Sequence, residues 1–174
     1  MPTTPWVPAS YNTSCAVTDI SPGYGGSTRA AQLSCDNTLN DDSVISQNLA
    51  TCAGVKYDLS FYYKIIYGQA EGSYVQITVF DTPSSKILCQ QNLENYCAPG
   101  TVPMVDGYGN IEGDWYQANK TVAPGFGQIT ALSSTTTVQI LLRSGFSGQQ
   151  TLYIAFDNVA FQAIVPTGAT IVGQ

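Results

Sequence analysis

The stretch Tyr57-Asp-Leu-Ser-Phe-Tyr-Tyr-Lys-Ile-Ile-Tyr67 alternates apolar or aromatic residues with mostly polar ones along its whole length. This period of two is typical of a β-strand with one buried face, because successive side chains of a strand point to opposite faces of a sheet. The same period predicts strands over 73–80, 135–143 and 152–161. In the first stretch the expected inward residues are Tyr57, Leu59, Phe61, Tyr63 and Ile65, and the expected outward residues are Asp58, Ser60, Tyr62, Lys64 and Ile66.

Shorter apolar runs, separated by turn-forming residues, extend this pattern over the rest of the chain. No stretch shows the 3.6-residue period of a helix. About nine strands in a chain of 174 residues predict a single all-β domain, either a β-sandwich or a barrel. Residues 96–113 show no period and are expected to form a long loop. The shorter predicted strands cover 14–20, 30–35, 43–49, 85–90 and 115–121.

The composition excludes several classes of function. Charged residues make up 10% of the chain, and six Lys and Arg against twelve Asp and Glu give a net charge of −6. A nucleic-acid surface needs clustered positive charge, so this balance excludes nucleic acid as a partner. The chain has no histidine, which excludes Ser-His-Asp triads, histidine zinc sites and proton transfer by imidazole. No apolar run reaches the length of a membrane span.

Cysteines and glycosylation motifs predict an extracellular protein. The chain has five cysteines, and disulfides persist mainly in secreted proteins. Asn12-Thr-Ser14 and Asn119-Lys-Thr121 are both acceptor motifs for N-glycosylation. We therefore expect a secreted or cell-wall-associated glycoprotein with glycans on Asn12 and Asn119.

Two disulfides are expected. Cys89 and Cys97 flank a short polar loop and form the favoured pair, and Cys15 with Cys35 is the second. If 30–35 and 43–49 form a hairpin, Cys35 and Cys52 lie at its opposite ends, beyond the reach of a disulfide. The fifth cysteine either lost its partner with a removed segment or is a buried free thiol.

Several segments, taken in order, carry a resemblance to a known family. They are Gly23-Tyr-Gly-Gly-Ser-Thr-Arg-Ala-Ala-Gln-Leu33, Ile45-Ser-Gln-Asn-Leu49, Cys52-Ala-Gly-Val-Lys-Tyr-Asp-Leu-Ser-Phe-Tyr-Tyr-Lys64, Trp115-Tyr116 and Tyr153-Ile-Ala-Phe-Asp-Asn-Val-Ala-Phe161. Together they resemble the CenC-type carbohydrate-binding modules of families 4, 9 and 22, most of all the versions in secreted fungal proteins. The resemblance implies a galactose-binding-like jelly roll over residues 1–161, which leaves 162–174 as a C-terminal tail or linker.

The resemblance also implies a metal, and the sequence departs from the family there. Members open with an Asn-x-x-Phe-Glu strand, and they often hold a structural calcium between that Glu and the Asp of Asp-Asn-Val. That first strand is missing before Trp6, so only Asp157 matches the calcium ligands. The alternative is that Asp157 accepts hydrogen bonds from backbone N–H groups. A missing edge strand would also favour self-assembly by strand exchange, with Thr170-Ile-Val172 of a second copy as the donor.

A sugar site needs aromatic platforms with amide or charged partners at their edges. If the strands 57–67, 73–80 and 135–143 share one sheet, their outward side chains form such a face; the alternative is an ordinary solvated face. A second expected surface lies at the loop containing Tyr96, Tyr108, Asp114, Trp115 and Tyr116, although core packing is the favoured alternative for Trp115 and for Trp6. The outward side chains of the first surface are Tyr62, Lys64, Tyr74, Gln76, Thr78, Gln139 and Arg143.

The sequence thus predicts a non-catalytic module that binds a cell-wall or plant polysaccharide by tyrosine stacking and amide hydrogen bonds. Most of the carboxylates lie in expected turns beside Gly, Asn or Ser, where they serve the turn. A small glycan-active enzyme is the weakest alternative, and it would need a pair of carboxylates facing each other across a groove. The stronger alternative is a structural or adhesive surface protein that kept the fold and self-assembles.

Overall fold

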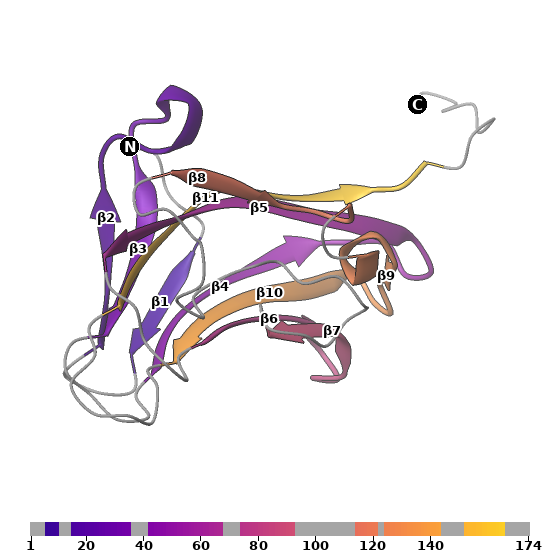
Figure 1. Ribbon diagram of the computed structural model, residues 1–174. Helices are drawn as coiled ribbons and strands as arrows, with labels where there is room; N and C mark the ends of the chain where they lie inside the picture. The colour runs from indigo at the N-terminus through magenta and orange to yellow at the C-terminus, as the bar shows by residue number, and fades with distance from the viewer. Residues whose placement is uncertain are drawn as a thin grey trace.

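The computed structural model describes residues 6–10, 15–35, 42–67, 74–92, 114–121, 124–143 and 152–165. Two antiparallel sheets pack face to face in these ranges (Figure 1). One sheet, called sheet A here, has the order β1 (Val7–Ser10), β4 (Asp42–Ala50), β10 (Thr135–Arg143), β6 (Tyr74–Asp81) and β7 (Ile87–Asn92). Sheet B has the order β2 (Cys15–Ile20), β3 (Ala30–Cys35), β11 (Leu152–Ala163), β5 (Lys56–Tyr67) and β8 (Trp115–Ala118), with β9 (Ile129–Thr130) paired to β5. Two short 3-10 segments, η1 (Tyr24–Gly26) and η2 (Pro124–Gly127), lie between strands.

The all-β jelly-roll sandwich is confirmed, and every strand predicted from the alternation is present. Within the described ranges the sequence missed two strands, β1 and β9, which have four and two residues. Segments this short cannot display a period of two. The last strand runs to Ala163, two residues beyond its expected end, and the Ile164 N–H donates to the Lys56 carbonyl at 2.8 Å.

The core is built by the alternation that defines the strands. On β5 the side chains of Tyr57, Leu59, Phe61 and Tyr63 are all buried. The inward residues of β6 and β10 are fully buried against them, as are Phe126 of η2 and Phe156 of β11. Burial of each such side chain contributes about 1.5–3 kcal/mol to the stability of the folded state. The inward-facing side chains that the alternation specifies therefore hold the two sheets together. The inward residues of β6 and β10 are Val75, Ile77, Val79, Val138, Ile140 and Leu142.

Two pairings expected from the sequence are wrong. The segments 30–35 and 43–49 do not form a hairpin, because β3 belongs to sheet B and β4 to sheet A. Likewise β5 lies in sheet B, while β6 and β10 lie in sheet A. The chain crosses from one sheet to the other between these strands, and a period of two carries no information about which sheet a strand joins.

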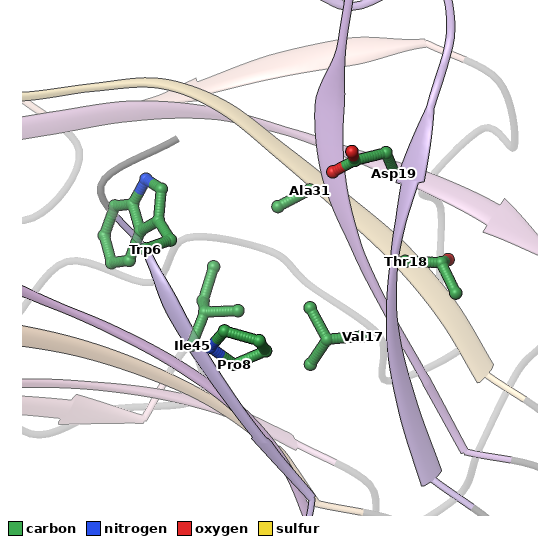
Figure 2. Close-up of a pocket in the computed structure, with 7 residues that line it drawn as sticks. All are labelled: Trp6, Pro8, Val17, Thr18, Asp19, Ala31 and Ile45. Atoms are coloured by element: carbon green, nitrogen blue, oxygen red, sulfur yellow. The ribbon is translucent and has the colours of Figure 1, made fainter. Parts of the chain in front are cut away.

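The sandwich has an open edge where β1 of sheet A lies opposite β2 of sheet B. A slot of about 210 Å³ separates them, with Trp6, Pro8 and Ile45 on one side and Val17, Thr18, Asp19 and Ala31 on the other (Figure 2). Trp6 packs against the core there, as the sequence predicted for this residue. Pro8 lies on an edge strand, the part of a sheet where a residue without an N–H group is tolerated.

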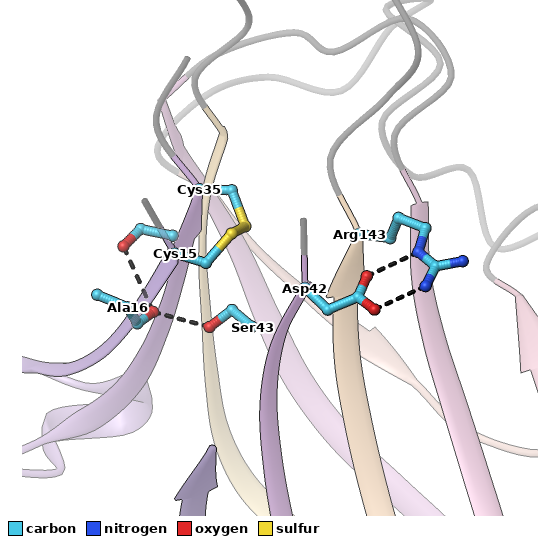
Figure 3. The surroundings of a disulfide bond; sticks show 7 residues. Cys15, Ala16, Cys35, Asp42, Ser43 and Arg143 are labelled. Carbon is cyan, nitrogen blue, oxygen red and sulfur yellow. Dashed lines mark hydrogen bonds and ion pairs between the residues drawn. A yellow bond between two sulfur atoms is a disulfide. The ribbon is translucent and has the colours of Figure 1, made fainter. Parts of the chain in front are cut away.

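The Cys15–Cys35 disulfide is confirmed. It joins register partners of β2 and β3 whose Cα atoms are 4.1 Å apart (Figure 3). Cys89 is buried on β7, and its predicted partner Cys97 lies outside the described residues. Cys52 is exposed and forms no disulfide with any cysteine of the described ranges, so the interpretation of the fifth cysteine as a buried thiol is wrong.

Polar contacts tie the sheets and strands together at this same end of the sandwich. The Ser43 hydroxyl on β4 donates to the Ala16 carbonyl on β2 at 2.8 Å, which links sheet A to sheet B. Arg143 donates two hydrogen bonds to the Asp42 carboxylate, from Nε to Oδ1 at 2.7 Å and from Nη2 to Oδ2 at 2.6 Å (Figure 3). This paired geometry is the strongest form of an ion pair between these residue types.

A buried carboxylate at the end of β6 makes stability depend on acid pH. The hydroxyl groups of Ser133 and Ser84 lower the pKa of Asp81, which is 3% exposed, and the Ser84 N–H adds to the effect. The folded state therefore gains stability from ionised Asp81 above the unfolded pKa, and this gain is lost as pH falls below about 4. We expect Asp81→Asn to unfold at a lower temperature than the wild type at neutral pH, with the gap narrowing in acid. Measuring the unfolding temperature of the wild type, of Asp81→Asn and of the exposed control Asp114→Asn from pH 7 to pH 2 tests this. A difference between the wild type and Asp81→Asn that stays constant over this pH range would contradict the prediction.

Candidate functional site

The structure divides the predicted sugar-binding face into two. Tyr62 and Lys64 lie on the outer face of sheet B, whereas Gln76, Gln139 and Arg143 lie on strands of sheet A, whose outer face is on the opposite side of the sandwich. The expectation that these side chains share one surface is wrong, because β5 and β10 belong to different sheets. Tyr74 begins β6, but its side chain lies outside the described residues, as do Tyr96 and Tyr108.

The outer face of sheet A carries amide, hydroxyl and apolar side chains, and Thr78, which was expected to be exposed there, is buried at 7% exposure. Gln139 lies between Ser46 of β4 and Thr78 of β6 in the register, and Gln76 lies opposite Leu141. The Asp42–Arg143 ion pair closes one end of this face. Among the side chains described here, the alternation places one aromatic, Phe80, on the face. The described side chains of this face thus offer hydrogen bonds and a single aromatic ring.

The outer face of sheet B carries three aromatic side chains in contact, Tyr24, Tyr62 and Trp115, which we call the aromatic cluster. The rings of Tyr24 and Tyr62 are stacked with centroids 3.5 Å apart and planes 14° apart. Trp115 meets Tyr24 edge-on at 5.9 Å. All three side chains are partly exposed. The cluster therefore combines rigid ring surface with access to solvent, which is what stacking on a ligand requires.

Strand pairing between β5 and β8 explains how Trp115 reaches this face. The register pairs Lys64 with Trp115 and Tyr63 with Tyr116. Tyr116 therefore points inward and stacks on buried Tyr63 at 5.6 Å, while Trp115 points outward. The interpretation of Trp115 as a core residue is wrong; its neighbour Tyr116 takes that place.

Two further groups set the chemistry of the cluster. The Lys64 ammonium lies 6.0 Å from the centre of the Trp115 ring, within the range of a cation–π contact. A hydrogen bond with the Tyr24 phenol, followed by burial, raises the pKa of Tyr62. Tyr62 is therefore a neutral phenol at physiological pH, able to donate or accept a hydrogen bond beside the rings.

Asp157 holds Tyr24 in the cluster. Its Oδ2 accepts hydrogen bonds from the Tyr24 N–H at 2.7 Å and from the Ser27 hydroxyl at 2.6 Å, and its Oδ1 accepts from the Asn158 N–H at 2.7 Å. Asp157 is also the register partner of Tyr62. The turn closes this tightly because Gly23 has no side chain: a Cβ there would lie 2.3 Å from Asp157 Oδ2. Sequence reasoning missed Tyr24, whose only signal was its place in a glycine-rich turn.

The described residues around Asp157 do not fit a calcium ion. Calcium takes about six to eight oxygen ligands, whereas both oxygens of Asp157 already accept hydrogen bonds from N–H and O–H donors. The two backbone N–H groups among these donors present hydrogen atoms, not lone pairs, to the carboxylate. No group of three or more His, Cys, Asp or Glu side chains clusters anywhere in the described ranges. The geometry instead matches the alternative in which Asp157 caps backbone N–H groups.

A hollow that we call the polar groove lies further along the same face. It has a volume of about 190 Å³ and lies between β5, the end of β8 and the last residues of β11. Asn119, the predicted glycosylation site, forms part of its wall, and its side-chain oxygen accepts from the Thr121 N–H at 2.8 Å. Lys120 and Asp58 form an ion pair beside it. The lining residues are Asp58, Leu59, Ser60, Gln117, Asn119, Lys120, Thr121 and Gln162.

The slot at the open edge is a poorer candidate site. Five of its seven lining residues are apolar, and its one aromatic, Trp6, packs against the core (Figure 2). A smaller cavity of about 50 Å³ shares Trp6, Ala31 and Ile45 with it. We read both hollows as incomplete packing between the two sheets. The helical segments of the described chain are single 3-10 turns, and none could cross a membrane.

Comparison with known proteins identifies the fold. No family model matches the chain. No curated protein matches it either. Among solved structures, a family 61 carbohydrate-binding module in complex with β-1,4-galactotriose superposes with a TM-score of 0.55 at 13% identity, over 92% of this chain and 90% of that one.

Two further solved structures share the fold as part of much longer chains. The family 22 and catalytic modules of Clostridium thermocellum xylanase 10B, complexed with xylohexaose, match with a TM-score of 0.52 at 13% identity, over 91% of this chain and 26% of that one. The enzymatically active domain of tailspike protein 4 from bacteriophage CBA120 matches with a TM-score of 0.55 at 17% identity, over 92% of this chain and 20% of that one. At these identities the comparisons show a shared fold, and this fold is the one that carbohydrate-binding modules adopt.

Proposed function

We propose that this chain is a non-catalytic carbohydrate-binding module of a secreted protein, and that it takes up a cell-wall or plant polysaccharide on the outer face of sheet B. The observation that carries the proposal is the aromatic cluster of Tyr24, Tyr62 and Trp115. The fold and the sequence resemblance to modules of secreted fungal proteins support it. Calcium is not part of the proposal, because the donors around Asp157 do not fit the ion.

The chemistry of sugars supports this face over the opposite one. A pyranose ring presents an apolar face edged by hydroxyl groups, so a site gains most from an aromatic surface next to hydrogen-bonding groups. The aromatic cluster supplies the rings, and Lys64 and Gln117 lie beside them in the register of β5 and β8. Each contact is weak, so we expect dissociation constants that are micromolar or poorer, about −8 kcal/mol at most.

The ligands bound in the similar solved structures guide the choice of ligands for a test. The family 61 module was solved with β-1,4-galactotriose, and the xylanase modules with xylohexaose. We propose that this chain binds an extended polysaccharide of the same general kind. A retention screen on β-1,4-galactan, xylan, glucans, mannan and chitin would identify the polymer.

The test combines this screen with single aromatic deletions. We expect Trp115→Ala and Tyr62→Ala each to lower affinity at least about 30-fold, because a buried aromatic anchor contributes about 2 kcal/mol or more. Phe80→Ala is the matched control, since it removes one ring from the outer face of sheet A and should retain the polymer. Loss of binding in Phe80→Ala, with binding kept in Trp115→Ala, would move the site to the other sheet. No retention of the wild type on any polymer would refute the proposal.

The alternative is a structural or adhesive protein that self-assembles through strand edges. Within the described ranges β1 pairs only with β4 and β2 only with β3, so each has an edge without a partner strand. These two unpaired edges, those of β1 and β2, are the feature that favours assembly. The donor predicted from the sequence, Thr170-Ile-Val172, lies outside the described residues. Measuring the mass in solution by light scattering over a concentration series distinguishes this alternative, which requires oligomers.

A further inference from the structure

We propose that the polar groove is a second subsite of the same binding face, and that the ligand is an extended, uncharged glycan chain running along β5 from the aromatic cluster into the groove. The proposal rests on the proposed function and specifies the ligand class. It is carried by three observations. The two features lie next to each other on one face, the groove side chains suit hydroxyl groups, and the Asp58 and Lys120 charges of the groove form an ion pair.

Strand geometry places the two features in line. The outward residues of β5 alternate from Tyr62 in the aromatic cluster through Ser60 to Asp58 in the groove. With a rise near 3.4 Å per residue, the four residue steps from Tyr62 to Asp58 span about 14 Å, which is longer than one sugar ring. Gln117 links the two features, because it lines the groove and is the register partner of Tyr62 in the cluster. A bound chain therefore has a continuous path from ring surface to polar groove.

The groove side chains match the edges of sugar rings. Ser60, Thr121 and the amides of Gln117 and Gln162 line the hollow. Hydroxyl and amide groups both donate and accept hydrogen bonds, as sugar hydroxyls do. Gln117 and Gln162 are exposed, so their amides are accessible to a ligand. The polar groove therefore suits the hydroxyl groups of one sugar of a glycan, while the ring of a neighbouring sugar stacks on the aromatic cluster.

The charges favour an uncharged chain. Among the described residues that line the groove, Asp58 supplies the one carboxylate, and its Oδ2 is paired with the Lys120 ammonium, so the local charges largely neutralise each other. The whole chain carries a net charge of −6, which repels polyanions such as polyuronates. Neutral polysaccharides such as xylan, galactan or glucan therefore suit this face better than acidic ones.

The N-glycan predicted on Asn119 decides whether glycosylated or unglycosylated protein should be tested. Asn119 forms part of the groove wall, so an N-glycan attached there would project beside the proposed path of the ligand. Full-length protein made in a host that does not glycosylate removes this competitor. Circular dichroism and thermal unfolding of each variant then establish that the fold is intact.

The experiment measures affinity against chain length by isothermal titration calorimetry. The probes are β-1,4-linked xylo-, galacto- and gluco-oligosaccharides from disaccharide to hexasaccharide, with polygalacturonate as the charged comparison. We expect affinity to rise with length, and we expect Gln162→Ala to weaken the hexasaccharide about fivefold, the equivalent of one hydrogen bond, while the disaccharide is unchanged. Trp115→Ala should weaken every length. Gln139→Ala, the same change on the outer face of sheet A, is the matched control and should bind like the wild type.

Three results would overturn this inference in distinguishable ways. Equal affinity for disaccharide and hexasaccharide, still lost in Trp115→Ala, would leave the proposed function standing and remove the groove from it. A loss in Gln139→Ala in place of Gln162→Ala would place the chain on sheet A. Tighter binding of polygalacturonate than of any neutral chain would refute the uncharged ligand class. Absence of binding by the wild type at every length would reject the proposed function itself.

Discussion

Replacing Cys15 and Cys35 together by alanine is expected to lower the free energy of unfolding by about 3 kcal/mol. The disulfide spans a sequence separation of 20 residues, and a loop of that size restricts the unfolded chain by about this amount. Both cysteines are also core residues, with exposures of 4% and 0%, so the loss of packing adds to the effect.

The disulfide closes a loop of the chain that contains η1 and Tyr24. It joins the ends of β2 and β3, and η1 lies in the connection between these strands. Chemical denaturation followed by circular dichroism measures the free energy, and reduction of the wild type offers a second route to the same state. Cys52→Ala, which changes an exposed thiol, is the control and should unfold like the wild type. A difference of less than about 1 kcal/mol for the double variant would show that strand pairing alone holds the hairpin.

Replacing Asp157 by alanine is expected to abolish most glycan binding at the aromatic cluster. The change removes the acceptor that holds the Tyr24 N–H and the Ser27 hydroxyl, and hydrogen bonds to a charged group contribute about 1.5–3 kcal/mol each. Without them η1 is no longer tied to β11, and Tyr24 loses its fixed place on Tyr62. We expect a loss of affinity comparable to that of Tyr62→Ala, at least about 30-fold.

Two companion measurements separate this role from a metal site and from general unfolding. Gly23→Ala leaves the carboxylate in place but puts a Cβ 2.3 Å from its Oδ2 and 2.9 Å from the Arg29 carbonyl oxygen, so it should displace the same turn and weaken binding too. EDTA should leave both binding and unfolding temperature of the wild type unchanged. Asp19→Ala, the loss of a carboxylate that forms an exposed ion pair with Arg29, is the control. Binding that is lost in EDTA and restored by calcium would contradict the capping role of Asp157.

The candidate site was only partly accessible from the sequence. Tyr62, Lys64 and Trp115 were predicted from alternation and from the loop aromatics, and the structure brings these three together. Gln76, Gln139 and Arg143 were predicted on the same grounds but lie on the opposite sheet. Tyr24 went unnoticed because its role depends on Asp157, which is 133 positions away in the sequence.

The sequence by itself determined the local structure of this protein. A period of two specifies which side of a strand is buried, and that information lies within a few neighbouring residues. The strands β5, β6 and β10 were therefore predicted together with their inward faces, and β11 was predicted as a strand. Only the tertiary structure decided which strands share a sheet, because pairing depends on contacts between distant segments and the same alternation satisfies either sheet. The aromatic cluster forms where three such segments meet, from η1, β5 and β8. Its existence is therefore a property of the assembled sandwich and of the hydrogen bonds by which Asp157 closes the turn against it.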